Sequence, residues 1–419
     1  MFRPLSYILD RVVKSGCLRV TDADGRSREF GDRSGAPIAV RIADRRTERR
    51  LAFDPPLAIG EAYMHGCLVI EQGSIYDFFE LLAVNFNARS WPRWMRATEK
   101  LRFLTRRLSQ VNLRARAKRN VAHHYDLDGK LYDLFLDADR QYSCAYFEEP
   151  GMSLDAAQAA KKRHLASKLR LKDGMKVLDI GCGWGGLALY LAKTARVSVT
   201  GVTLSENQLR IARERASAMG LSKAVKFELC DYRDLNQQFD RIVSVGMFEH
   251  VGLSHYGAFF ERIAGLIKPD GVALLHSIGR LDGPAAMNRF MTKYIFPGAY
   301  LPALSEVLPV LERKGLLVTD IEIWRLHYAM TLRHWRQRFR ANWRAAAAMF
   351  DERFCRMWEC YLAICEAGFR YQNLMVFQLQ LAKTQTALPL TRDYMYDAER
   401  EMRLRDSQQS PSKRRRTAS

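Results

Sequence analysis

Short apolar runs alternate with amphipathic segments from residue 175 onward. The amphipathic segments, such as ENQLRIARERASAMG and GAFFERIAGLI, place their apolar residues at helical spacing. The apolar runs are short and bounded, as buried parallel strands are. There are seven of them: MKVLDI, VSVTGV, KFELC, RIVSVG, VALLHSIG, LLVTDIEI and LMVFQLQL. This alternation predicts an α/β fold with a doubly wound, seven-stranded sheet and helical crossovers.

Residues 1–92 follow a different pattern and predict a small N-terminal α+β domain. The opening MFRPLSYILDRVVKSG is amphipathic and contains Asp10, so it predicts a helix and not a signal peptide. The pieces CLRVTD, IAVRIAD and RLAF resemble strands, and SIYDFFELLAVNF resembles a helix.

Residues 93–119 carry ten Lys or Arg and a single acid, Glu99. Their apolar residues step by three and four, which predicts a basic amphipathic linker helix. This apolar face comprises Trp94, Ala97, Leu101, Leu104, Leu108 and Val111. Two interpretations stay open: a linker helix packed on its neighbour, or a helix resting on anionic lipid headgroups.

The remaining chain divides into a catalytic domain, residues 120–395, and a basic tail, residues 396–419, which we expect to be disordered. Within the former, residues 329–372 break the alternation with long aromatic-rich amphipathic helices, including RHWRQRFRANWRAAAAMF. We expect these helices to cap the carboxyl edge of the sheet.

Composition narrows the cellular setting. No stretch approaches the 18 apolar residues of a transmembrane helix, and the eight cysteines show neither a C-x-x-C pair nor metal-ligand spacing. We therefore expect a cytoplasmic protein without a metal site. The net charge of +20 favours a polyanionic partner, either nucleic acid or an anionic membrane surface. Because no nucleic-acid-binding module is recognisable, even with KRRR at 413–416, we expect no nucleic-acid partner.

The decapeptide VLDIGCGWGG, residues 177–186, carries the first chemical signal. Its glycines let the backbone turn where a strand passes into a helix, which is where nucleotide-like ligands bind in an open α/β sheet. The spacing also satisfies G-x-G-x-x-G, but a NAD site needs an acid after the second strand, and that strand ends in Thr203 and Ser205. The form DIGCGWG resembles motif I of S-adenosylmethionine-dependent methyltransferases. A loop that merely makes a tight turn is the remaining alternative.

Further strings extend this resemblance to one family. They are HHYDLDGKLYDLFLD, QYSCAYF, GVTLSENQ, CDYRDLNQQFDRIVSVGMFEHVG, LLHSIG, KYIFPGAYLP and LHYAMTLRHW, in this order. Together they resemble the cyclopropane-fatty-acyl-phospholipid synthase family, which includes the mycolic acid cyclopropane synthases, over residues 115 to 385. GEAYMHG and IYDFFELL extend a looser similarity into the N-terminal domain. The resemblance implies a Rossmann-like class I methyltransferase sheet with a helical cap.

The resemblance also implies a reaction and a set of donor-binding residues. A cis double bond of an unsaturated phospholipid acyl chain attacks the sulfonium methyl, and the resulting carbocation loses a proton as a cyclopropane ring closes. Tyr125 would cover the donor, Tyr142 and Ser143 would touch its methionine end, and Asp231 and Tyr232 would flank its adenine. The glycine loop and the ribose region would supply Asp179, Gly181, Cys182, Gly183, Trp184, Gly185, Thr203, Leu204, Ser205 and Gln208.

In the family a bicarbonate ion or an equivalent base takes up the proton. The matching positions are Cys144, Glu249, His276, Tyr328 and Ile278, the last through its backbone because its side chain cannot hydrogen-bond. A covalent role for Cys144 is disfavoured because the alkene is itself the nucleophile. An apolar channel for the acyl chain has as candidates Phe290, Tyr294, Phe296, Tyr300, Phe369 and Tyr371.

Two alternatives stay open within this chemistry: a methyl-branched or methylene product formed without ring closure, and methylation of a small molecule. As partners we expect unsaturated phospholipids of an anionic membrane, with the enzyme peripherally attached to its cytoplasmic face. By resemblance, a homodimer through the N-terminal domain is also expected.

Overall fold

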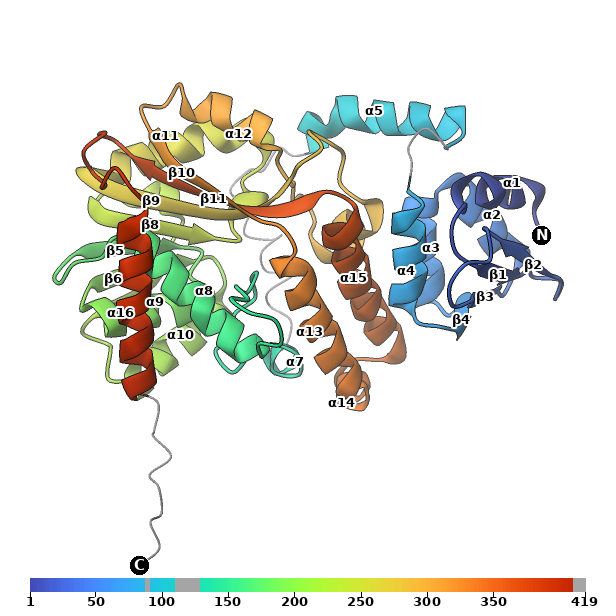
Figure 1. The fold of residues 1–419 in the computed structure, drawn as a ribbon, viewed down its shortest axis with the longest axis horizontal. Coiled ribbons are helices and arrows are strands. Elements are labelled where there is room, and N and C mark those ends of the chain that lie inside the picture. The colour runs from blue at the N-terminus through green and yellow to red at the C-terminus, as the bar shows by residue number, and fades with distance from the viewer. Residues whose placement is uncertain (87–90, 110–128, 410–419) are drawn as a thin grey trace, which may run out of the picture.

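The computed structural model describes residues 1–86, 91–109 and 129–409, and its larger sheet has seven strands in the order β10-β11-β9-β8-β5-β6-β7 (Figure 1). All seven predicted runs are strands of this sheet. Their bounds are β5 Lys176–Ile180, β6 Ser198–Thr203, β7 Val225–Leu229, β8 Phe239–Val245, β9 Ile267–Arg280, β10 Leu317–Trp324 and β11 Leu374–Ala382. The five neighbouring strands β9, β8, β5, β6 and β7 pair in parallel, whereas β11 runs antiparallel to both β9 and β10.

Helices cover both faces of this sheet and bury it. On one face lie α11 Tyr256–Leu266 and α12 Leu304–Leu311, with an aromatic core that includes Phe259 and Phe260. The other face is covered by α8 Leu154–Lys168, α9 Gly186–Ala195 and α10 Glu206–Ala218. Because side chains alternate along β9, Leu275 faces the first core while Leu274 faces the second.

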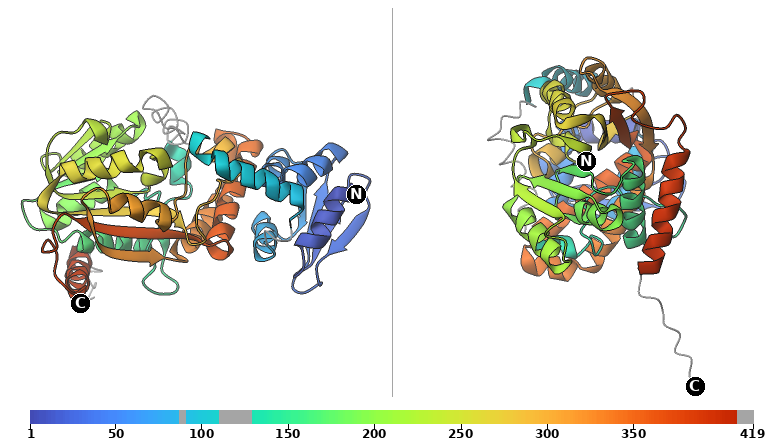
Figure 2. Two further views of the ribbon diagram at one scale, coloured as in Figure 1. Left: turned by 90° about the horizontal axis from the view of Figure 1, so that it is seen from above. Right: turned by 90° about the vertical axis from the view of Figure 1, so that its left-hand side faces the viewer.

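Three aromatic-rich helices lie between this sheet and the N-terminal domain (Figures 1 and 2). They are α13 His327–Ala341, α14 Trp343–Met349 and α15 Glu352–Tyr371. Together with α7 Gly129–Asp133 they enclose a core of rings that includes Trp335 and Trp358. Trp184, which follows β5, belongs to the same core, so the helices cap the carboxyl end of that strand, as the sequence predicts.

The N-terminal region folds around a four-stranded sheet in the order β2-β1-β3-β4. Its elements are α1 Arg3–Val12, β1 Leu18–Thr21, β2 Ser27–Phe30, β3 Ile38–Ile42, α2 Arg45–Phe53, α3 Pro55–Met64, β4 Leu68–Gln72 and α4 Ile75–Val84. The prediction of a strand at RLAF is wrong, because these residues end α2. Asp44 caps this helix by accepting a hydrogen bond from the Thr47 backbone, and Thr47 and Leu51 share a buried face at helical spacing. The sequence analysis did not identify β2 and β4.

The basic helix α5 Arg93–Ser109 joins the two regions, and part of its predicted apolar face is exposed. Leu101 and Leu104 are 62% and 65% exposed, and Trp94 is 39% exposed. Leu101 and Leu104 are thus not packed on a neighbour, whereas the Trp94 ring contacts the Phe53 ring of α2 at a centroid distance of 5.7 Å. The side chains of Leu108 and Val111 lie outside the described part.

The opposite side of α5 holds it in place. The Arg102 guanidinium donates to the Met287 carbonyl at 2.6 Å, and Arg106 pairs with Glu306 at 3.3 Å. Because these polar contacts point inward, the apolar stripe points outward.

The C-terminal helix α16 Asp393–Gln409 corrects the predicted tail. Residues 396–409 are helical because Met395, Glu399 and Met402 form a buried stripe at helical spacing, and the helix packs against α8. The catalytic unit thus extends beyond residue 395, and residues 410–419 lie outside the described part.

Polar contacts and close packing join the N-terminal region to the catalytic unit. The buried Glu61 on α3 pairs with Lys293 at 2.7 Å and accepts a hydrogen bond from the Tyr294 hydroxyl at 2.7 Å. The Phe290 ring fills the space where a side chain at Gly60 would be. Within the described residues, no helix is long and apolar enough to cross a membrane.

Candidate active site

A glycine loop follows β5 and opens into a cavity of about 200 Å³. Gly181, Gly183 and Gly185 all have positive φ angles, which only glycine adopts readily. Gly185 packs closely, since a side chain there would meet the Phe227 ring at 2.6 Å. Gly183 faces open space, and so does Gly246 at the end of β8, which also has positive φ and lines the cavity. The backbone therefore leaves room for a ligand on both sides.

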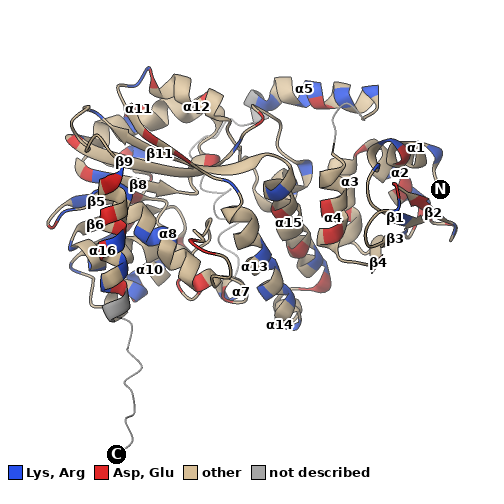
Figure 3. Cartoon of the chain, viewed as in Figure 1, with Lys and Arg blue, Asp and Glu red and all other residues tan. Residues whose placement is uncertain are grey.

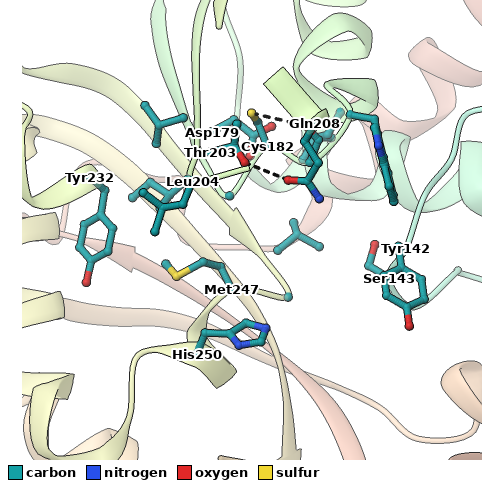
Figure 4. A pocket seen from close by; sticks show the side chains of 18 of the residues that line it. Tyr142, Ser143, Asp179, Cys182, Thr203, Leu204, Gln208, Tyr232, Met247 and His250 are labelled. Atoms are coloured by element: carbon teal, nitrogen blue, oxygen red, sulfur yellow. Dashed lines mark hydrogen bonds between the residues drawn. The ribbon is translucent and has the colours of Figure 1, made fainter. Parts of the chain in front are cut away.

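Twelve of the predicted donor-binding residues line this cavity. They are Tyr142, Ser143, Asp179, Gly181, Cys182, Gly183, Trp184, Thr203, Leu204, Gln208, Asp231 and Tyr232. Tyr232 lies at one end and Tyr142 with Ser143 at the other, as expected for the adenine and methionine ends of an elongated donor (Figure 4). Leu204 and Met247 lie between them.

Three predicted residues do not contribute to the lining. Gly185 is the N-cap of α9, and the Ser205 hydroxyl accepts a hydrogen bond from the Gln208 backbone as the N-cap of α10. Both residues thus begin helices beside the cavity. Tyr125 lies outside the described residues.

The ribose region contains neutral side chains in place of an acid. The Thr203 hydroxyl donates to the Gln208 side-chain oxygen at 2.8 Å, which leaves the Gln208 amide N–H groups for a ligand. Asp231 binds the Arg233 guanidinium, with Nε to Oδ1 at 2.8 Å. Both oxygens of the Asp231 carboxylate thus accept hydrogen bonds from Arg233.

Asp179 and Lys161 set the electrostatics of the methionine end. Burial raises the pKa of Asp179 to about 7, and its Oδ2 atom has no hydrogen-bond partner among the described residues. The buried Lys161 ammonium donates to Ser143 Oγ and to Gln141 Oε1, both at 2.7 Å, and burial lowers its pKa to about 8. Lys161 thereby fixes Ser143, while Asp179 offers an unused acceptor to a cation.

Glu249 is the buried centre of the second cluster. One carboxyl oxygen, Oε1, accepts a hydrogen bond from the Ile278 backbone N–H at 2.6 Å. The other, Oε2, is buried without a partner among the described residues. Burial raises the pKa of this carboxyl to about 7. The Ile278 N–H, which the sequence analysis expected to contact the anion, is therefore used by Glu249.

His276, Tyr328 and Cys144 are buried near Glu249. His276 lies two residues before Ile278 on β9 and shares its face of the sheet. Glu249 and Cys144 both influence the pKa of the Tyr328 hydroxyl, which burial raises well above its ordinary value. Burial likewise raises the pKa of the Cys144 thiol, so this residue is not a reactive thiolate. None of these groups lines the cavity after β5 directly. Their chain neighbours do: Ser143 precedes Cys144, and His250 follows Glu249.

Comparison with known proteins identifies the family. A profile described as mycolic acid cyclopropane synthetase matches residues 112–379. The chain is 38% identical to the cyclopropane-fatty-acyl-phospholipid synthase of Escherichia coli (strain K12), covering 83% of this chain and 88% of the relative. It is 41% identical to a probable fatty acid methyltransferase of Pseudomonas putida, over 66% and 73% of the two chains.

The chain belongs to the cyclopropane synthase family. Among solved structures it resembles the mycolic acid cyclopropane synthase CmaA1 complexed with SAH and CTAB, with a TM-score of 0.60, 35% identity, and coverage of 63% of this chain and 97% of that one. These relatives establish an S-adenosylmethionine-dependent methyltransferase with the predicted class I fold.

The six aromatic residues proposed for an acyl channel are dispersed in the structure. Phe369 stacks near Tyr328 at a centroid distance of 4.7 Å, and Phe296 packs on Tyr361 at 5.8 Å. The other four lie elsewhere, at the interface with the N-terminal region or in the core below α12: Phe290, Tyr294, Tyr371 and Tyr300. Tyr300 also adjoins the second cluster, because its backbone N–H donates to the Glu249 carbonyl at 2.9 Å.

The sequence analysis missed several residues that the fold brings to the cavity. Lys161 lies on α8 in a segment without a motif, and only its burial reveals it. Met247 and His250 belong to the quoted string GMFEHVG, from which Glu249 alone was selected.

Proposed function

We propose that this enzyme transfers a methylene group from S-adenosylmethionine to the cis double bond of unsaturated phospholipid acyl chains and forms a cyclopropane ring. The observation that carries this proposal is the buried Glu249, with one oxygen unpartnered among the described residues, next in the chain to His250, which lines the cavity proposed for the donor. The name of the Escherichia coli relative supports the substrate class.

The donor cavity suits a cationic, elongated ligand. An amino or sulfonium group near Asp179 would meet an acceptor that lacks a partner, and its charge would favour the ionised carboxylate. Tyr232 would pack beside the adenine, and the Gln208 amide would donate to the ribose. Lys161 would keep the Ser143 hydroxyl at the methionine end.

The reaction needs a protected cation and a proton acceptor. The alkene attacks the sulfonium methyl, S-adenosylhomocysteine leaves, and the cation loses a proton from the new methyl group as the ring closes. The Tyr142 ring packs on Trp335 at 5.1 Å in a core that excludes water, and aromatic faces stabilise positive charge.

The buried polar cluster fits a bicarbonate ion. With a pKa near 7, Glu249 is partly protonated at neutral pH, so Oε2 can donate a hydrogen bond to an anion. The Tyr328 hydroxyl stays neutral and can donate as well. When bound, bicarbonate would supply the base that takes up the proton.

Helix α5 offers a surface for docking on anionic membranes. Leu101 and Leu104 form an exposed apolar stripe, and Arg93, Arg96 and Lys100 are exposed beside it (Figure 3). Leucine side chains can enter the apolar boundary of a bilayer while basic residues bind headgroups. We propose that the enzyme attaches peripherally to the membrane through this helix, at its cytoplasmic face.

A second outcome of the same methyl transfer is a methyl-branched chain. The similarity to a probable fatty acid methyltransferase of Pseudomonas putida supports a methyl-branched product as the second candidate. It differs from the first only in how the cation is quenched.

The requirement for a double bond tests the substrate class. We expect the purified enzyme to release S-adenosylhomocysteine with vesicles of mono-unsaturated phospholipid and not with vesicles of the saturated analogue, measured by liquid chromatography. Equal release from both would contradict attack by the alkene.

A further inference from the structure

Two buried polar side chains outside the predicted site hold one side of the His276 ring. Gln378 on β11 lies opposite His276 in the strand pairing, and its Nε2 is 3.1 Å from His276 Nδ1. The Lys168 ammonium, from α8, donates to Gln378 Oε1 at 2.7 Å. Gln378 and Lys168 are 0% and 2% exposed, so solvent does not compete for these bonds.

The chemistry of these groups fixes where the His276 proton lies. A lysine ammonium can only donate, so it must face the amide oxygen of Gln378. The amide NH₂ group then faces His276 and donates to Nδ1, which must be an unprotonated acceptor. In the neutral ring, which burial favours by lowering the pKa of His276, the proton is on Nε2. Nε2 makes no hydrogen bond with any described residue and is left for a ligand.

Lys168 is itself anchored by a longer network. It pairs with Glu322 on β10 and lies 3.9 Å from the Asp320 carboxylate. Glu322 also binds His164 Nε2 at 2.8 Å, and His164 Nδ1 is 3.3 Å from Glu399 on α16. The two carboxylates next to Lys168 compensate its charge, so its ammonium stays in place against Gln378.

We propose that Lys168 and Gln378 are positioning residues that hold His276 as the Nε2-protonated tautomer, so that its ring presents a donor to the anion at the active site. This inference rests on the proposed function only in its last part, the anion. The opposite tautomer would present a lone pair to the same anion and weaken its binding.

The tautomer can be measured directly in the unmodified enzyme. Long-range proton–nitrogen NMR spectra of protein labelled with ¹⁵N-histidine distinguish the two neutral forms, and loss of a signal in His276→Gln assigns it among the nine histidines. We expect the Nε2-protonated form. An Nδ1-protonated ring in the unmodified enzyme would overturn the proposal without the need for any positioning variant.

Two amide substitutions separate positioning from structure. Gln378→Glu replaces the donor with an acceptor, so we expect His276 to become protonated on Nδ1 and the bicarbonate concentration for half-maximal activity to rise about tenfold. Gln380→Leu is the matched control, because Gln380 is equally buried on the same strand but binds the Lys168 carbonyl and Tyr394. It should change neither readout.

The two proposals fail in different ways. An unchanged His276 signal in Gln378→Glu would overturn the positioning role. The other outcome is a ring that is protonated on Nε2 in the unmodified enzyme and on Nδ1 in Gln378→Glu, while activity does not depend on bicarbonate. This would support the positioning role and contradict the proposed anion.

Discussion

Glu249 illustrates how a single buried side chain links stability to chemistry. Burial outweighs the hydrogen bonds from Ile278, Ser277 and its own backbone, which lower the pKa of this carboxyl, and raises the pKa to about 7. A group held near neutrality can donate to an anion or become an anion itself. The same property makes ionisation costly when no ligand is bound.

We expect Glu249→Gln to change the pH dependence of unfolding. The pKa of Glu249 rises on folding from 4.5 to about 7, so the folded state binds the proton more tightly and the free energy of unfolding falls as pH rises through this window. The variant cannot ionise. Its stability relative to the unmodified enzyme should therefore increase by about 3 kcal/mol between about pH 4 and about pH 8, measured by urea unfolding without bicarbonate.

The exposed Glu261 provides the control. Its carboxylate is 70% exposed and pairs with Lys314 on the surface, so Glu261→Gln should leave the slope with pH nearly unchanged. If the free energy of unfolding of Glu249→Gln varied with pH in parallel with that of the unmodified enzyme, Glu249 would be ionised in the folded state.

At the scale of elements, α5 shows that an amphipathic pattern does not say what its apolar face contacts. The face with Leu101 and Leu104 is exposed because Arg102 and Arg106 on the other side bind Met287 and Glu306. Figure 1 shows α5 extending over both regions at the edge of the molecule.

We expect Leu101→Ser combined with Leu104→Ser to weaken binding to vesicles that contain anionic phospholipid. Loss of the apolar contact of two leucines reduces the binding free energy, so we expect the affinity for vesicles to fall roughly tenfold or more, measured by vesicle sedimentation. Leu404→Ser, on α16, is the matched control because Leu404 is 64% exposed. Equal losses in both variants, or none, would contradict docking through α5.

Elements with a strong local pattern could be predicted from the sequence, and those defined by distant contacts could not. The seven apolar runs all became strands, because burial on both faces of a parallel sheet leaves a continuous apolar signature. RLAF was mistaken for a strand because four residues are too short to reveal helical spacing. In α16, Met395 and Met402 are separated by charged residues, and only α8 explains their burial.

In the candidate site, too, residues in local motifs could be predicted and residues defined by distant contacts could not. Tyr142, Asp179 and Gln208 lie in motifs that predict donor binding, and they line the cavity, whereas Lys161 and Gln378 lie in segments without a motif. Their roles depend on partners more than 15 residues away in the chain, such as Ser143 for Lys161 and His276 for Gln378.

At the scale of the whole molecule, the donor cavity, the buried polar cluster and the exposed helix form one arrangement. The glycine loop and the end of β8 line the cavity proposed for the donor. His276 lies on β9 and Tyr328 on α13, and α5 extends over both regions (Figure 1). The contacts of Glu61 with Lys293 and Tyr294 join the N-terminal region to the catalytic unit. Such an arrangement suits an acceptor that reaches the donor from a membrane.

The product formed on mono-unsaturated phospholipid vesicles tests the central claim most directly. After incubation with S-adenosylmethionine, mass spectrometry and proton NMR of the acyl methyl esters should show the gain of one CH₂ unit per converted chain together with upfield cyclopropane protons. A CH₂ gain without those protons would contradict ring closure and indicate a branched chain. No gain of mass, in an enzyme shown to bind the donor, would contradict unsaturated phospholipid as the acceptor.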